Sequence, residues 1–163
     1  MTTLAVGAQA PQFVLNGIDS KPYELGEGLR RGPLLLIFIK SGCPACDLAL
    51  PYFLRLRHTY PEGWTLWAVS QDSRDRSQEY AQRLALTFPV LVDVPSYLVS
   101  RAYDPPATPT MFFIEPDGSI AFTNHGFSKG DVNQLSSLIA NHLKVEAKVI
   151  AERDDGQPSF RPG

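Results

Sequence analysis

Residues 33–46 read PLLLIFIKSGCPAC and contain both cysteines of this 163-residue chain. The first half, Pro33–Ile39, is a continuous apolar run of strand length, which is typical of a central strand covered on both faces. Lys40, Ser41 and Gly42 interrupt this run. The sequence therefore predicts a buried strand that ends just before a Cys-x-x-Cys motif.

A helical pattern begins at this motif. Leu48, Tyr52 and Leu56 recur at steps of four beside a second apolar row, which indicates a helix with a broad buried face that runs to about His58. Cys43 is then expected at the N-terminus of this helix. Unpaired amide groups and the positive end of the helix dipole favour a thiolate there, so Cys43 should be the more reactive and more exposed sulfur.

The spacing of the two cysteines indicates redox chemistry. Two intervening residues bring Cys46 back within one helical turn, so Cys46 can attack a mixed disulfide formed on Cys43 and release the partner reduced. Pro44 suits the first helical turn, because its missing N–H would have no partner at that position. We interpret the motif as a centre that alternates between dithiol and disulfide.

Two other uses of a cysteine pair fit this sequence less well. A structural zinc site normally needs four protein ligands, and His58, His125 and His142 are scattered without ligand spacing. A purely structural disulfide would close so small a loop that it would add little stability. We therefore expect neither a metal nor another cofactor.

Composition limits the choice of partner and compartment. The net charge is −2 and no basic cluster is present, which argues against nucleic acid and anionic membranes as partners. No stretch approaches the length of a membrane span, and Met1–Ala8 lacks the charge and the apolar length of a signal peptide. We expect a cytoplasmic protein, or a periplasmic or otherwise extracytoplasmic one if an export signal has been removed.

Strand and helix patterns alternate along the rest of the chain. This alternation predicts an α/β fold with a central mixed β-sheet flanked by helices, built as one domain over residues 1–145. Residues 146–163, rich in proline and glycine towards the end, are expected to form a loose extension. The expected elements are a hairpin of Gln12–Leu15 with Lys21–Glu24, strands at Trp64–Ser70 and Phe88–Asp93, helices at Arg74–Leu86 and Ser96–Tyr103, a hairpin of Met111–Ile114 with Ser119–Thr123, and a final helix from about Ser128.

A second informative motif, Thr108-Pro109-Thr110, stands directly before one of these strands. Because proline cannot donate to a strand ladder, Pro109 belongs at a sheet edge or in a special turn. The Glu115-Pro116-Asp117-Gly118 turn that follows the strand is typical of a hairpin.

Taken together, these motifs resemble the thioredoxin-like superfamily, and within it the TlpA/ResA and AhpC/TSA-related redoxins. The resemblance extends from about Gly7 to Leu143 and includes the opening Gly7–Leu15, the CPAC motif, the helix proline Pro51 and the segment Thr108–Gly118. It implies a thioredoxin-like fold with an N-terminal β-hairpin extension. It also implies a thiol-disulfide oxidoreductase.

The resemblance implies roles for the matched residues. Cys43 is similar to the attacking cysteine and Cys46 to the resolving one. Pro109 is similar to the cis-proline that lies against the dithiol, and Thr108 before it would face the sulfurs and present its backbone to a substrate strand. A cis bond between Thr108 and Pro109 is therefore predicted.

Three positions depart from the family pattern. The tryptophan that commonly precedes the first cysteine is Gly42, so the rim of the site, where Gly42 and Pro44 would contact substrate, is smaller. The buried acidic residue of thioredoxins is replaced by Ile37, and a glutamate common in TlpA/ResA-like proteins is replaced by Ala49.

These departures leave open how Cys46 exchanges its proton. Asp47, Lys40 and water are the candidates that the sequence offers. The expected partners are protein disulfides or thiols, together with an electron donor of the thioredoxin-reductase type or another thiol. We expect the protein to be a monomer.

A peroxiredoxin-like thiol peroxidase is the alternative function. Peroxiredoxins place a proline and a threonine or serine before their reactive cysteine, where this chain has Leu36 and Lys40. Without that pattern the hydrogen bonds that hold the peroxide are lost, which disfavours a peroxidase. A binding module that no longer uses its dithiol is the third possibility, and it is disfavoured because reactive thiols cluster at functional sites.

Overall fold

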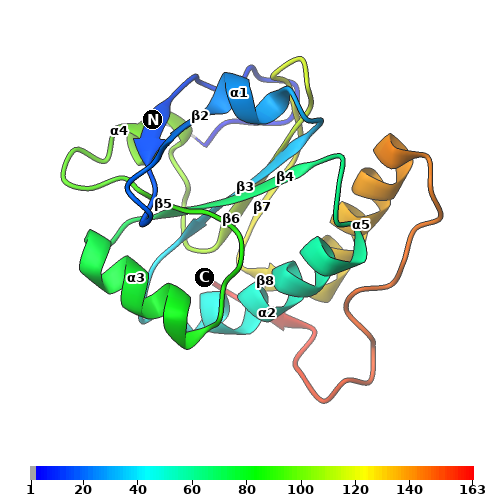
Figure 1. The fold of residues 1–163 in the computed structure, drawn as a ribbon. Helices are drawn as coiled ribbons and strands as arrows, with labels where there is room; N and C mark the ends of the chain where they lie inside the picture. Colours follow the sequence, from blue (N-terminus) through cyan, green and yellow to red (C-terminus); the bar gives the residue numbers. More distant parts are fainter. Residues whose placement is uncertain (1–2) are drawn as a thin grey trace.

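The computed structural model describes residues 3–163, and its centre is a five-stranded sheet in the order β5-β4-β3-β6-β7 (Figure 1). β3 pairs in parallel with β4 and β4 with β5, whereas β3 with β6 and β6 with β7 are antiparallel. The predicted mixed sheet, with the apolar run as its middle strand, is confirmed. The strands are β3 (Leu34–Ile39), β4 (Thr65–Ser70), β5 (Val90–Val92), β6 (Thr110–Ile114) and β7 (Ile120–His125).

Helices cover both faces of this sheet. The short helices α1 (Leu25–Leu29) and α4 (Leu98–Tyr103) lie on one face, and α2 (Pro44–Thr59), α3 (Arg74–Arg83) and α5 (Lys129–Leu143) lie on the other (Figure 1). Within residues 3–163, none of these helices has the length and apolar character needed to cross a bilayer.

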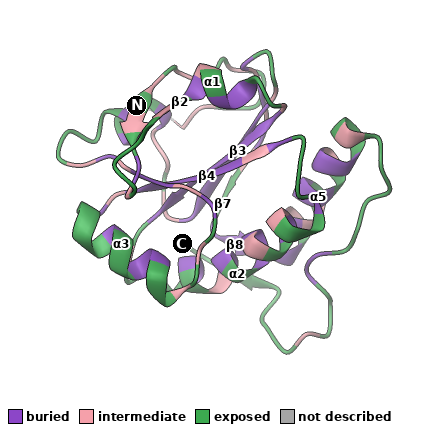
Figure 2. Ribbon diagram, in the orientation of Figure 1, coloured by how far each residue is buried: buried purple, intermediate pink, exposed green. Residues whose placement is uncertain are grey.

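The six residues of β3 hold the two layers together, because each is at most 1% exposed (Figure 2). Successive side chains of a strand point to opposite faces. Leu35 and Ile37 accordingly join the core formed with α2, α3 and α5, while Leu36 and Phe38 join the core formed with α1 and α4. Burial of each such side chain stabilises the fold by about 1.5–3 kcal/mol. The strand is therefore firmly held, and so is the start of the segment that leads from its end to the cysteine motif.

The N-terminal hairpin is also confirmed. β1 (Val14–Asn16) pairs antiparallel with β2 (Pro22–Glu24). The helix expected over residues 74–86 is shorter, because α3 ends at Arg83 and Ala85 takes a left-handed backbone conformation with φ of 54°. A left-handed residue cannot continue a right-handed helix.

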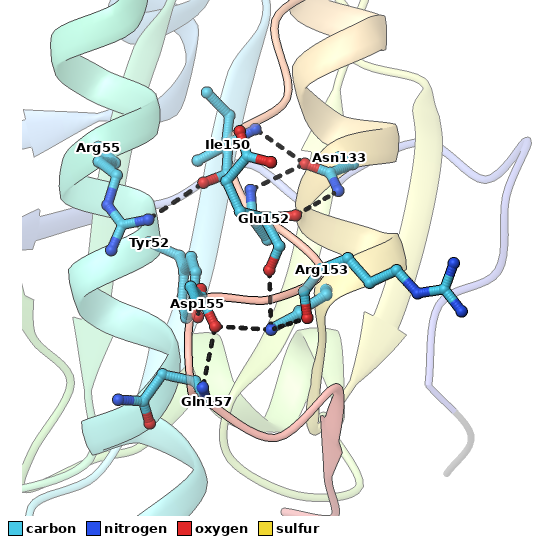
Figure 3. Close-up of polar contacts among 10 residues, drawn as sticks. Tyr52, Arg55, Asn133, Ile150, Glu152, Arg153, Asp155 and Gln157 are labelled. Carbon is cyan, nitrogen blue, oxygen red and sulfur yellow. Dashed lines mark hydrogen bonds and ion pairs between the residues drawn. The ribbon is translucent and has the colours of Figure 1, made fainter.

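Part of the extension that was expected to be loose, residues 146–163, is anchored to the core of the protein. Ile150 and Ala151 are only 4% and 3% exposed, and both pack into the core beside α2 and α5. The side chain of Asn133 on α5 accepts hydrogen bonds from their two amides, each at 2.9 Å, and donates to the carbonyl of Ala151 at 3.0 Å (Figure 3). Two buried apolar residues and one asparagine thus fix a segment that has no apolar periodicity.

A charged group fixes the next part of this segment. Lys129 is 6% exposed, and its Nζ donates to the carbonyls of Glu152 and Arg153 and to Oδ1 of Asp155 at 2.6 Å. The hydroxyl of Tyr52 on α2 donates to the other carboxylate oxygen of Asp155 (Figure 3). The hydrogen bond from Lys129 holds the pKa of the Asp155 carboxyl well below its usual range, so this carboxyl stays ionised.

Replacing Asn133 by alanine tests whether this anchoring stabilises the fold. The change removes three hydrogen bonds that satisfy buried backbone groups, so we expect the free energy of unfolding to fall by about 2 kcal/mol. Urea denaturation measures this difference. Asn141→Ala, an exposed position on the same helix, is the matched control and should cost less than about 0.5 kcal/mol. Equal losses in the two variants would contradict the anchoring role.

Candidate active site

The site lies at the junction between the end of β3 and the start of α2. Ser41 and Gly42 form the turn between them, and Gly42 has φ of 78°, a left-handed conformation that glycine adopts without steric cost. The amide of Ser41 donates to Oδ2 of the buried Asp72 at 2.7 Å, which fixes the turn from the end of β4. Cys43 follows as the N-cap residue of α2, and Pro44 takes the first helical position, as predicted.

The Cys43 sulfur interacts with two backbone groups. Its Sγ accepts a hydrogen bond from the amide of Cys46 at 3.1 Å, which is the capping interaction that helices normally receive from an oxygen. The Cys43 thiol in turn donates to the carbonyl oxygen of Thr108 at 3.2 Å. Cys43 is partly exposed, and both cysteines are free thiols. Its sulfur is therefore reachable and has a backbone amide donor beside it.

Cys46 has a different environment. It is fully buried against the sheet, and this burial raises the pKa of its thiol, with a further contribution from the hydrogen bond to Cys43. The backbone of Lys40 and the side chain of Thr108 oppose part of this shift. Cys46 is consequently held as a protonated thiol near neutral pH.

The Thr108–Pro109 bond is cis, as predicted. Thr108 faces the dithiol through its carbonyl, and the carbonyl of the buried Pro109 accepts a hydrogen bond from the amide of Gly126 at 2.8 Å. The hydrogen bond from Cys43 to Thr108 thus joins the start of α2 to the start of β6. All six residues expected at the site, Gly42, Cys43, Pro44, Cys46, Thr108 and Pro109, are brought together around this contact.

Two further residues near the site were not found from the sequence. Asp72 supports the turn before Cys43, and Tyr80 on α3 donates its hydroxyl to Oδ1 of Asp47 at 2.7 Å. Burial raises the pKa of Tyr80, and the hydrogen bond to Asp47 raises it further, so this hydroxyl stays protonated. Both contacts join residues more than thirty positions apart, so no local pattern could have revealed them.

Within residues 3–163, no three histidine, cysteine or acidic side chains gather closely enough to hold a metal ion. A mixed sheet with two helical layers, a helix that starts at a Cys-x-x-Cys motif and a cis-proline facing the first sulfur define a thioredoxin-like protein with a redox-active dithiol.

Comparison with known proteins agrees with this class. A family model described as the AhpC/TSA family matches residues 6–123, and the chain belongs to this family. The thiol-disulfide oxidoreductase ResA of Geobacillus kaustophilus is 31% identical over 121 residues, covering 73% of this chain and 68% of its own. The ResA of Geobacillus thermodenitrificans is 29% identical over 136 residues, covering 82% and 77%.

A solved structure supports the same assignment. A putative thiol:disulfide interchange protein DsbE from Chlorobium tepidum superposes with a TM-score of 0.77 and is 25% identical. The match covers 86% of this chain and 99% of that one.

The different environments of the two sulfurs predict selective alkylation. Treating the reduced native protein with iodoacetamide near neutral pH should modify Cys43 at least about tenfold faster than Cys46, because only Cys43 is reachable and the raised pKa keeps Cys46 protonated. Peptide mapping by mass spectrometry measures both rates. In urea the two rates should converge, and equal rates in the native protein would contradict the structure.

Proposed function

We propose that this protein is a thiol-disulfide oxidoreductase in which Cys43 attacks and Cys46 resolves. The observation that carries the proposal is the pair of hydrogen bonds at the Cys43 sulfur, one from the amide of Cys46 and one to the carbonyl of Thr108. The first gives the attacking sulfur a backbone donor, and the second holds it beside a backbone that an extended substrate can pair with. Curated relatives that carry the name thiol-disulfide oxidoreductase support it.

The proposed reaction consists of two exchanges. The Cys43 thiolate attacks one sulfur of a substrate disulfide, forming a mixed disulfide and releasing the other substrate sulfur as a thiolate. Cys46 then loses its proton and attacks the Cys43 sulfur, which releases the second substrate thiolate and leaves a Cys43–Cys46 disulfide. Two electrons have passed from the protein to its substrate, and a thiol donor returns them by the reverse steps.

The burial of Cys46 serves this sequence of steps. A protonated Cys46 is a poor nucleophile, so it does not compete with Cys43 for the incoming disulfide. Once the mixed disulfide has formed, Cys46 must release its proton. We propose that Asp47, the chain neighbour of Cys46 whose carboxylate is held by the Tyr80 hydroxyl, assists this step, with Lys40 and water as the alternatives.

The partners follow from the same chemistry. The substrates are thiols and disulfides, and we propose protein disulfides as the main class, with a thioredoxin-reductase-type protein or another thiol as electron donor. A monomer is proposed, since one chain contains the whole dithiol site. The cytoplasmic location expected from the sequence, and its extracytoplasmic alternative, stay predictions.

Single cysteine variants test the order of attack. Cys46→Ser should trap a mixed disulfide between Cys43 and insulin, because no second thiol remains to release the substrate. Cys43→Ser should trap none, since the remaining thiol is buried. Non-reducing gels with mass spectrometry detect the adducts. Equal trapping by both variants would refute the assignment, and rapid consumption of hydrogen peroxide with no disulfide exchange would favour the peroxidase.

A further inference from the structure

A short segment near the end of the chain crosses beside the dithiol. We call residues Ser159–Gly163 the strap. Its strand β9 (Phe160–Arg161) pairs antiparallel with β8 (Phe127–Ser128), and the amide of Lys129 donates to the carbonyl of Ser159 at 3.0 Å. Figure 1 shows the red C-terminal end of the chain lying close to the labels of β8 and α2.

The strap reaches the backbone that contacts the reactive sulfur. A Cβ atom built on Gly163 would lie 2.5 Å from the carbonyl oxygen of Thr108, so Gly163 packs directly against this group. A Cβ on Gly126 would lie 3.0 Å from the carbonyl oxygen of Arg161, so the strap also packs against the residue that donates to Pro109. The Thr108 oxygen is the same atom to which the Cys43 thiol donates.

The strap is held much less firmly than the segment before it. Residues 150–155 are fixed by buried apolar contacts and by the Asn133 and Lys129 hydrogen bonds, whereas all five strap residues are exposed and Phe160 is 61% exposed. A two-residue strand pair is a weak association on its own. The strap can therefore detach from β8 while the rest of the protein stays folded.

We propose that the strap determines which disulfides reach Cys43. It occupies the strip beside Thr108 on which an extended polypeptide would pair, so a protein disulfide reacts only after the strap has moved, whereas a small disulfide reaches the partly exposed Cys43 directly. While attached, the strap thus slows exchange with protein disulfides, which remain the main substrate class once it has moved, and leaves exchange with small disulfides unaffected. This inference rests on the proposed thiol-disulfide exchange. It adds that the strap determines the preference of the enzyme between protein and small disulfides.

The test compares Arg161→Pro with Arg161→Ala in the full chain. Proline removes the backbone donor of Arg161 from β9, whereas alanine removes only the side chain, so the second variant is the matched control. Because the apparent affinity rises with the fraction of molecules that are open, we expect Arg161→Pro to reduce insulin about fivefold faster than the wild type. The rate with oxidised glutathione should change less than about twofold, since its access to Cys43 does not depend on the strap.

A second variant opens the strap by a different route. In Gly163→Val the new side chain cannot fit beside the Thr108 carbonyl, and Gly26→Val on α1 is its control, because a Cβ there approaches only flexible side-chain ends. Faster hydrogen exchange at the Lys129 amide, which donates to Ser159, is expected in both opened variants and does not depend on redox activity.

The outcomes separate the two proposals. An increased ratio of insulin to glutathione rates in Arg161→Pro and Gly163→Val, with unchanged ratios in both controls, supports the strap as a specificity element. An unchanged ratio in both opened variants, while the wild type reduces both disulfides, overturns the strap proposal and leaves the oxidoreductase intact. Failure of every protein, the wild type included, to exchange either disulfide overturns the proposed function itself.

Discussion

The site depends on the hydrogen bond from the Cys46 amide to the Cys43 sulfur. The bond forms because Cys43 is the N-cap residue of α2, and Cys43 has that position because β3 ends four residues earlier. Burial of β3 in both cores fixes its end with respect to the helix, and the left-handed Gly42 directs the chain into the first turn. A capping interaction that stabilises a helix thus also prepares a sulfur for reaction.

The same geometry places two chemically identical side chains in different environments. Cys43 projects from the helix start towards Thr108 and is partly exposed, whereas Cys46, one turn further on, points into the core and keeps its proton. The cis peptide segment at the start of β6 faces the exposed sulfur from the opposite side. The amide that donates to Cys43, the carbonyl of Thr108 and the buried second thiol therefore meet within one small region.

Local patterns explain what the sequence could predict. The apolar run of β3, the four-residue spacing of α2 and the CPAC motif each lie within a few neighbouring residues, and the resemblance to a known family added the cis bond before Pro109. The anchoring of residues 150–155 could not be predicted, because it depends on single contacts such as Asn133 with Ala151. The support of Ser41 by Asp72 was missed for the same reason.

The central claim is that Cys43 and Cys46 act as one two-electron couple, and a redox titration in glutathione buffers tests it most directly. Mass spectrometry after acid quenching would follow both thiols. The structure predicts a single transition in which the two thiols disappear together and the protein loses two hydrogen atoms, because the sulfurs lie within one helical turn. Stable attachment of glutathione to Cys43 while Cys46 remains a free thiol throughout the titration would contradict it.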